Sequence, residues 1–433
     1  MNRYQAMPLS RHPVTPPEGG GFCGLGTLAE APLLPNRRDR TVLVVFTKPL
    51  WPIEHGNQER TVNMLRWLKS RGYRTILIMP GSKEASQRER GDDTVDEVVL
   101  VDGSTGTVEP PWAPTPLQNR DVAAERSLEF FRERIWCSTA MRAAVHKACL
   151  RSSPAAVIAN YIFMAPVFQA IPDSTLRIID THDTFSRQAE KVSARGVKAP
   201  LACSPEIERS ALLAADVILA IQPEERKYLA GLVPERDVIT VGVAHDRPVR
   251  ATHAVKENTV LFVGSSNIPN QDGIRYFLGR VWPLVLERMP SATLRVAGRI
   301  CDALLPAGGS IELMGYCEDL DKAYAEAALV INATRVGTGL KIKSLEAIAH
   351  GKPLVAWPDG LEGLPRGGSL PFVESETEAG FADAVVRILS DAPYRRALED
   401  DAYAYACEHF ASSKVFEALQ RTLDAWMIRR VSK

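Results

Sequence analysis

The sequence predicts an α/β protein made of two domains, each built on a parallel sheet covered by helices. Apolar runs of strand length alternate with amphipathic helical stretches along most of the chain, a pattern typical of parallel sheets. The chain has 433 residues, which is more than a single hydrophobic core usually holds. A polar stretch over residues 246–258 separates two such alternating series, and we interpret it as a hinge.

The overall composition is that of a globular protein, with 45% hydrophobic and 24% charged residues. Lys plus Arg and Asp plus Glu both number 52, so no basic excess favours a nucleic-acid partner. The seven cysteines are scattered without a CxxC pair, which indicates neither a zinc site nor a disulfide framework and fits a reducing cytoplasm. No apolar run reaches membrane-spanning length, and the N-terminal stretch lacks the apolar core of a signal peptide.

The first 39 residues differ in composition from the rest. They are rich in Pro and Gly and lack periodicity, so we expect residues 1–39 to form a disordered or loosely attached extension. The stretch GGGFCGLG at 19–26 resembles a dinucleotide fingerprint, but it follows no strand and opens no clear helix.

The first domain is expected over residues 40–245 and opens with a strand–helix–strand unit. The apolar run Thr41–Phe46 predicts a buried strand, a helix follows, and Thr75–Met79 should be the next parallel strand. The loop after the first strand holds Gly56 and Asn57, where a ligand could approach a strand's carboxyl end. A plain turn is the alternative interpretation of this loop.

The rest of the first domain continues the alternation. In order, the sequence predicts a Pro-rich loop over 104–121, a helix over 122–150, strands over Ala155–Asn160 and Leu176–Asp180, a helix over Pro205–Ala214, a strand over Asp216–Ile221, a helix from Gln222 and a strand over Val238–Val243. His182 lies just past the end of one of these strands. A histidine suits proton transfer near neutral pH, although a lone histidine is more often structural.

The second domain is expected over residues 259–405. Its first predicted elements are a strand over Thr259–Gly264, a loop over Ser265–Asp272, a helix over Gly273–Arg288 and strands over Ala292–Ala297 and Ile311–Met314. A C-terminal helix over 406–433 should either cross back onto the first domain or pack on its own domain.

The segment from Ala328 to Pro365 is the most informative part of the chain. It predicts a buried strand, a glycine-rich loop, an amphipathic helix and another strand. A helix that begins at the carboxyl end of a parallel strand offers free N–H groups and a dipole to an anion. Lys341 and Lys343 add positive charge there, and Glu346 lies on the same helix face as Lys343. An ordinary surface ion pair is the alternative for the last two residues.

The run GTGLKIKSLEAIAHGKPLVAWPDGLEGL resembles the donor-site signature of the group 1 family of retaining glycosyltransferases. That family has the GT-B fold, in which two Rossmann-like domains face each other across a cleft. The resemblance implies that Glu346 binds the nucleotide ribose and that Lys341 and Lys343 bind the diphosphate. These two lysines would also stabilise the charge that develops on the leaving diphosphate, which makes them catalytic candidates. The third catalytic candidate is His182, which matches a family histidine near the reacting sugar.

The same resemblance implies further binding positions. They are Gly264 and Ser265, Gly315 and Tyr316 beside the base, the loop residues Gly337, Thr338 and Gly339, the turn of Glu362, Gly363 and Leu364, and the cleft loop of Gly56 and Asn57. The chain departs from the family pattern at Thr338, where many members have a sugar-contacting glutamate. It also has Ser265 and Gln271 where many have a phosphate-binding arginine and lysine, so more of the phosphate charge should fall to the lysines.

The resemblance predicts a cytoplasmic glycosyltransferase that moves a sugar from a nucleotide-diphosphate sugar to a glycan, lipid-linked or protein acceptor. We expect retention, no metal and no cofactor, and a peripheral contact with the membrane is compatible with the sequence. Asp319-Leu320-Asp321 could hold a cation, but we interpret it as the capped, acidic start of a helix. Two alternatives stay open, a nucleotide-sugar epimerase of the same fold and a noncatalytic protein that binds nucleotide sugars.

Overall fold

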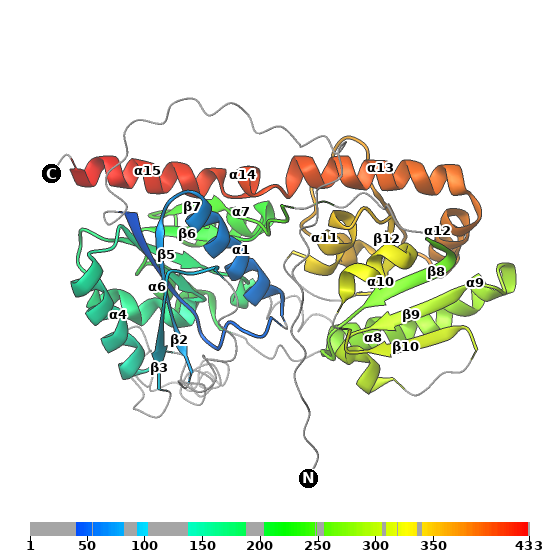
Figure 1. Cartoon of the computed structure of the whole chain (residues 1–433), viewed down its shortest axis with the longest axis horizontal. Coiled ribbons are helices and arrows are strands. Elements are labelled where there is room, and N and C mark those ends of the chain that lie inside the picture. Colours follow the sequence, from blue (N-terminus) through cyan, green and yellow to red (C-terminus); the bar gives the residue numbers. More distant parts are fainter. Residues whose placement is uncertain are drawn as a thin grey trace, which may run out of the picture. The chain divides into compact units, whose positions relative to one another are not determined.

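The structure is a computed structural model of the chain. It describes residues 40–53, 55–81, 93–102, 137–187, 203–246, 248, 255–304, 309–317, 319–335 and 340–431. Two parallel sheets with helices packed on them make up this part of the chain (Figure 1), so the predicted α/β class is confirmed. The predicted extension over 1–39 and loop over 104–121 lie outside the described residues.

The first sheet has seven parallel strands in the order β3-β2-β1-β4-β5-β6-β7. The strands are β1 (Thr41–Val45), β2 (Arg74–Pro80), β3 (Glu97–Val101), β4 (Ala156–Asn160), β5 (Leu176–Asp180), β6 (Val217–Ala220) and β7 (Asp237–Thr240). The helices of this half are α1 (Gly56–Ser70), α4 (Thr139–Ser152), the 3-10 helix η2 (Ile162–Ala170), α6 (Pro205–Leu212) and α7 (Pro223–Leu232). Leu43 and Val45 enter the core on one face, and Val42 and Val44 enter the core on the other. Both faces are therefore covered, as the continuous apolar runs predict.

Two elements of the first half differ from the prediction. Strand β3 was not predicted; it is five residues long and lies at the edge of the described sheet, where it pairs with β2. The predicted helix over 122–150 is described only from Thr139, where α4 begins, because residues 103–136 lie outside the described part. Ser138 caps α4, since its hydroxyl accepts a hydrogen bond from the Met141 N–H at 3.1 Å.

The second sheet has six parallel strands in the order β10-β9-β8-β11-β12-β13. The strands are β8 (Lys256–Val263), β9 (Thr293–Ala297), β10 (Ile311–Gly315), β11 (Ala327–Asn332), β12 (Leu354–Ala356) and β13 (Phe372–Glu374). The helical elements are α8 (Ile268–Tyr276), the π-turn η3 (Phe277–Val281), α9 (Trp282–Arg288), η4 (Arg299–Ala303), α10 (Leu320–Glu326), α11 (Ile342–Ala349), η5 (Pro358–Leu361), α12 (Glu378–Ser390), α13 (Ala392–His409), α14 (Ser412–Val415) and α15 (Glu417–Val431).

The single helix predicted over Gly273–Arg288 is wrong in two respects. It begins earlier, at Ile268, because the Asn267 side chain accepts from the Asn270 N–H at 2.9 Å and caps it. It is also interrupted by the π-turn η3 just before Pro283. Proline has no N–H to donate and its ring crowds the carbonyl four residues earlier, so a wider turn relieves that clash.

The predicted C-terminal helix over 406–433 is broken at Phe410 and Ala411. The Phe410 carbonyl accepts from the His245 N–H at 2.7 Å, and the Ser412 N–H donates to Asp246 Oδ1 at 2.7 Å. Backbone groups freed by the break are therefore used by the segment that connects the two sheets.

Helix α15 packs on the first sheet although it follows the second in sequence. Leu419 and Leu423 of α15, and Phe416 just before it, are buried in the same cluster as Val42 and Val44 of β1. The last helix thus contributes apolar area to the first core, which we expect to stabilise both halves together.

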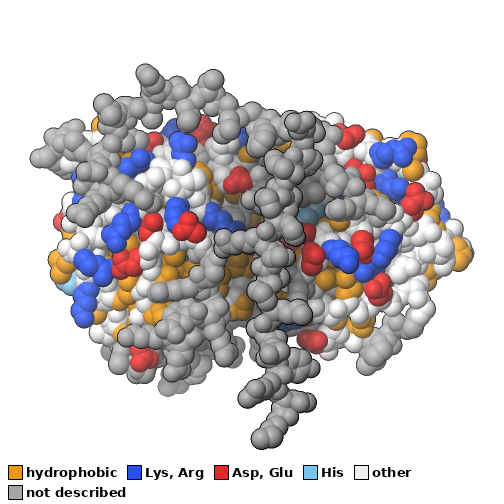
Figure 2. Space-filling model, in the orientation of Figure 1, with side chains coloured by type: hydrophobic (Ala, Val, Ile, Leu, Met, Phe, Trp, Pro, Cys, Tyr) orange, Lys and Arg blue, Asp and Glu red, His pale blue; other side chains and the backbone are white. Residues whose placement is uncertain are grey.

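Charges of both signs are interspersed on the face of the molecule that Figure 2 shows, in keeping with 52 basic and 52 acidic residues. Among the residues that the structure describes, no helix is long and apolar enough to cross a membrane.

Candidate functional site

The donor-binding residues predicted in the second half follow the carboxyl ends of its strands. Gly264 and Ser265 follow β8, Gly315 ends β10 and Tyr316 follows it, Lys341, Lys343 and Glu346 follow β11, and Glu362, Gly363 and Leu364 follow β12. Parallel strands all end at one edge of their sheet, so the fold gathers these segments along that edge. Gly337, Thr338 and Gly339 lie outside the described residues.

The carboxyl ends of β8, β9 and β10 approach one another backbone to backbone. The Gly264 N–H donates to the Ala297 carbonyl at 2.9 Å, and the Gly298 N–H donates to the Gly315 carbonyl at 2.7 Å. Gly298 has a φ of +100°, and a Cβ there would lie 2.3 Å from the Gly264 carbonyl oxygen. Only glycine fits at 298, and the sequence prediction did not include this residue. The Tyr316 side chain, by contrast, is 63% exposed.

Lys343 lies in the first turn of α11 with its ammonium group shielded from solvent. Its Nζ is buried and has no hydrogen-bond partner within the described residues. Burial lowers the pKa of Lys343 to about 8, and the neighbouring Glu346 carboxyl opposes that shift. An ammonium group without a partner at the positive end of a helix is a ready site for an anion.

Glu346 lies one turn further along α11, facing Tyr324 of α10. The Tyr324 hydroxyl donates to Glu346 Oε2 at 3.3 Å. Burial and the nearby Glu59 carboxyl raise the pKa of Glu346, and Lys343 opposes this. The His350 ring, at the C-terminal end of α11, stacks on the Tyr324 ring with centroids 4.2 Å apart. A carboxyl group held in this position can form hydrogen bonds to hydroxyl groups of a ligand.

The two acids of the Asp-x-Asp segment already have protein partners. Asp319 caps α10, since its Oδ1 accepts from the Lys322 N–H at 2.9 Å. Asp321 Oδ1 lies 3.0 Å from Nε2 of His350. The interpretation of this segment as a capped helix start agrees with that geometry.

The turn after β12 contacts the start of α11. The Lys341 N–H donates to the Glu362 carbonyl at 3.3 Å, and the Lys341 ammonium lies 3.7 Å from Glu362 Oε2. Gly363 has a φ of +87°, and a Cβ there would lie 2.4 Å from Gln222 Oε1 of the first half. The backbone of this turn therefore approaches the carboxyl end of β6 closely.

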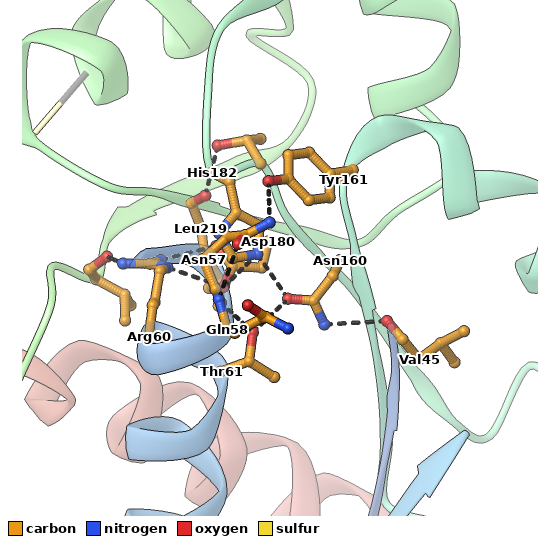
Figure 3. Close-up of polar contacts among 12 residues, drawn as sticks. Val45, Asn57, Gln58, Arg60, Thr61, Asn160, Tyr161, Asp180, His182 and Leu219 are labelled. Atoms are coloured by element: carbon orange, nitrogen blue, oxygen red, sulfur yellow. Dashed lines mark hydrogen bonds and ion pairs between the residues drawn. The ribbon is translucent and has the colours of Figure 1, made fainter. Parts of the chain in front are cut away.

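In the first half, a buried polar cluster joins α1 to the carboxyl ends of β4 and β5 (Figure 3). Arg60 of α1 donates to both carboxylate oxygens of Asp180, at 3.1 and 2.7 Å, and both side chains are fully buried. The same guanidinium donates to the Val241 carbonyl at 2.5 Å and to the Gly242 carbonyl. A bidentate pair with further acceptors holds its geometry firmly.

Asn160 decides which nitrogen of His182 carries the proton. The Asn160 amide donates to the Val45 carbonyl at 3.0 Å, so its oxygen faces His182 Nε2 at 2.7 Å (Figure 3). Nε2 must then be the protonated nitrogen, and Nδ1 keeps its lone pair. Nδ1 is buried without a hydrogen-bond partner in the described part of the chain.

His182 is also electrically neutral near pH 7. Burial lowers its pKa to about 4, helped by Arg60 and only partly opposed by Asp180. Its φ of +57° is unusual for a residue with a side chain and marks a strained position past the end of β5. Sequence reasoning singled out His182, but it missed Arg60, Asn160 and the groups that orient the ring.

The cleft loop residues lie beside this cluster. Asn57 Nδ2 donates to the Tyr161 hydroxyl at 2.8 Å, and the Tyr161 ring stacks on His182 with centroids 4.5 Å apart. A Cβ on Gly56 would lie 2.2 Å from Cδ1 of Ile342, the first residue of α11. Gly56 therefore permits a close approach between the start of α1 and the start of α11.

Comparison with protein families gives residues 257–391 as a match to the family described as Glycosyl transferases group 1. This part of the chain is therefore similar to a group 1 glycosyltransferase domain. A curated relative, the "uncharacterized 44.6 kDa protein in cps region" of Klebsiella pneumoniae, is 27% identical over 172 residues. The match covers 37% of this chain and 44% of that protein, so the chain spans less than half of this relative.

Solved structures show that the whole fold is GT-B. TarM matches with a TM-score of 0.63 and 10% identity, over 89% of this chain and 98% of its own. Sucrose-phosphate synthase from Thermosynechococcus elongatus matches with 0.65 and 16%, over 89% and 99%. The pneumococcal O-GlcNAc transferase GtfA, in complex with UDP and GlcNAc, matches with 0.63 and 12%, over 90% and 99%.

Proposed function

We propose that the protein is a retaining, metal-independent glycosyltransferase that uses a nucleotide-diphosphate sugar. The observation that carries this proposal is the buried Lys343 ammonium at the start of α11, one turn from Glu346, for which the described residues offer no hydrogen-bond partner. Helix α11 lies in the segment that matches the group 1 family. The diphosphate would bind Lys343 and the helix N-terminus, and the ribose would bind Glu346. UDP is the first nucleotide to test, because the similar protein HepE of Anabaena was solved with UDP and glucose.

The same groups account for the chemistry. In transfer, the bond between the anomeric carbon and a diphosphate oxygen breaks, and the acceptor's hydroxyl oxygen bonds to that carbon and releases its proton. Negative charge grows on the diphosphate as the bond breaks, so a fixed cation at that point lowers the barrier. With a pKa of about 8, Lys343 is mostly protonated at pH 7, and bound phosphate would raise that pKa further. Nucleotide affinity should therefore fall as the pH rises above about 8.

In this proposal, Lys341 and Lys343 neutralise the diphosphate charge in place of a divalent metal ion. Mg²⁺ is usually held by one or two carboxylates together with the phosphates. Asp319 and Asp321 are the donor-half acids best spaced for that task, and both have protein partners. We therefore expect turnover to persist in excess EDTA. Loss of turnover that Mg²⁺ or Mn²⁺ restores would show that Lys341 and Lys343 do not suffice.

Calorimetry with UDP, GDP and the matching nucleosides tests the binding site. Lys343→Ala should weaken the diphosphate about 10- to 150-fold, the arithmetic of a lost charged hydrogen bond, and leave the nucleoside nearly unchanged. Lys322→Ala is the matched control, because Lys322 lies at the start of α10 and is exposed. Equal weakening of nucleotide and nucleoside would indicate lost structure and refute the assigned role.

Incubation of the nucleotide sugar without an acceptor separates the proposal from an epimerase of the same fold. A transferase should return the sugar unchanged or slowly hydrolysed, whereas an epimerase would convert it to a stereoisomer. Anomeric configuration of the product, read by proton NMR with a working acceptor, would test retention.

A further inference from the structure

Four buried polar atoms at the carboxyl ends of β5 and β6 have no hydrogen-bond partner within the described residues. They are His182 Nδ1, Thr184 Oγ1, Gln222 Oε1 and Glu225 Oε2. The exposed fractions of these residues are 5, 1, 1 and 1%. Buried polar atoms are nearly always paired, and leaving one unpaired costs about 1–3 kcal/mol. Four such atoms at two neighbouring strand ends indicate a site for a polar ligand.

The fold brings these four residues together. Strands β5 and β6 are neighbours in the sheet, and the Thr181 N–H and hydroxyl both donate to the Leu219 carbonyl, at 3.2 and 2.9 Å. Thr181 and Leu219 therefore lie side by side at the ends of the two strands. Thr184 follows Thr181 by three residues, and Gln222 follows Leu219 by three residues. Gln222 and Glu225 lie side by side, with Nε2 3.5 Å from Oε1.

The chemistry of these atoms selects the ligand. The imidazole nitrogen, the amide oxygen and the carboxyl oxygen all offer lone pairs, so the ligand must present hydrogen-bond donors. Burial and the nearby Asp183 raise the pKa of Glu225 to about 8, and burial raises that of Asp183 to about 7. A largely neutral carboxyl can donate as well as accept, which suits hydroxyl groups better than an ammonium ion.

The position of Gln222 joins these atoms to the nucleotide-sugar site. A Cβ on Gly363 would lie 2.4 Å from Gln222 Oε1, so the Gln222 side chain contacts the turn that follows β12. The charge of Lys341, at the start of α11, lowers the pKa of the Asp183 carboxyl. A ligand held by Gln222 and Glu225 would therefore lie beside the proposed diphosphate site.

We propose that Thr184, Gln222 and Glu225, together with His182, form a subsite that binds the hydroxyl groups of a saccharide. This inference rests on the proposed glycosyl transfer. The hydroxyls could belong to the sugar being transferred or to a saccharide acceptor, since both present the same donors.

Two apolar variants, Gln222→Leu and Glu225→Leu, test the subsite. Each removes the unpaired oxygen and keeps roughly the same volume. One assay compares UDP with UDP-glucose, and GDP with GDP-mannose, by calorimetry. A second assay measures saturation-transfer NMR of methyl glucoside, galactoside and mannoside with the nucleotide present. Glu224→Leu is the matched control, because Glu224 is its exposed neighbour in α7.

If the transferred sugar occupies the subsite, both variants should weaken the nucleotide sugar about 2- to 12-fold and spare the free nucleotide. If a saccharide acceptor occupies it, the methyl glycoside signals should fall instead. Either result supports the subsite and names its occupant. The proposal is wrong if neither ligand is affected, or if free nucleotide weakens as much as nucleotide sugar. A wild-type protein that binds no nucleotide would refute the proposed function instead, and the methyl glycoside assay would still decide the subsite.

Discussion

Replacing Arg60 by methionine should destabilise the first half of the protein more than any single change at its surface. The guanidinium makes two bonds to the Asp180 carboxylate and two to backbone carbonyls, and neither side chain is exposed. Methionine fills much of the volume but leaves Asp180 buried without its countercharge. Burial alone raises the pKa of Asp180, and the Arg60 charge with its hydrogen bonds and His182 reverses this to a lowered pKa.

The size of the effect follows from these contacts. Removing one partner of a buried ion pair costs about 3–5 kcal/mol, because an uncompensated charge remains in the interior. For a unit of 150 to 250 residues, about 1 kcal/mol shifts Tm by roughly 2–4 °C, so Tm should fall by about 6–20 °C. Arg60→Met/Asp180→Leu should recover most of the loss, because a well-packed apolar pair often matches a buried ion pair in stability.

Thermal unfolding followed by circular dichroism measures the change, and Arg74→Met provides the matched control. Arg74 pairs with Glu97 at 2.8 Å, but the two side chains are 36 and 26% exposed, so this pair should contribute at most about 1 kcal/mol. The Arg60–Asp180 contribution should be present above the unfolded Asp pKa near 3.9 and disappear as the pH falls through the lower folded value. A Tm for Arg60→Met within 2 °C of the Arg74→Met value, or a double variant no better than the single one, would refute the reasoning.

Three further outcomes are expected. Glu346→Ala should keep the Tm and lose about 10- to 150-fold in nucleotide affinity by calorimetry, and unchanged affinity would remove Glu346 from the site. Because burial holds the pKa of His182 at about 4, the unfolded chain binds more protons than the folded one between that value and about 6.5. Stability should therefore rise as the pH increases across this window, and a His182→Gln variant should lose part of that slope in urea titrations. Gly363→Ala should impair both folding and nucleotide-sugar binding, because the added Cβ would lie 2.4 Å from Gln222 Oε1 and the φ of +87° is unfavourable for alanine. A second change, Gln222→Ala, should restore part of the binding. Equal binding by wild type and Gly363→Ala would contradict the close approach.

The sequence correctly predicted those helices, strands and caps whose pattern lies within a few neighbouring residues. The strand β11 and the helix α11 follow from an apolar run, a glycine-rich loop and a stripe of apolar residues, and both are present. The Asp319 cap follows from a short acidic start before helical periodicity, and its hydrogen bond to the Lys322 N–H is present. The π-turn before Pro283 and the break after His409 were missed, because each is a response to packing or to a partner distant in sequence.

The hydrogen bonds around His182 also could not be predicted from the sequence, because they join residues that are distant along the chain. Arg60 and Asp180 are 120 positions apart, and Asn160 and His182 are 22 apart. No local pattern marks Asn160 as the residue that sets the tautomer of a histidine, because its role depends on the Val45 carbonyl lying on its other side. Nothing in the sequence indicates that oxygens of Gln222 and Glu225 lack a partner among the described residues, because the two residues look like an ordinary acidic helix start.

The sequence by itself determined the α/β class, the two alternating series and the strand–loop–helix order that ends in α11, because periodicity, glycine placement and helix polarity act over a few residues. Only the tertiary structure decided that α15 packs on the first sheet, that Arg60 neutralises Asp180, and that four buried polar atoms at the ends of β5 and β6 find no partner among the described residues. These features depend on which strand ends and helix starts meet in space, and burial gives such contacts their energetic weight.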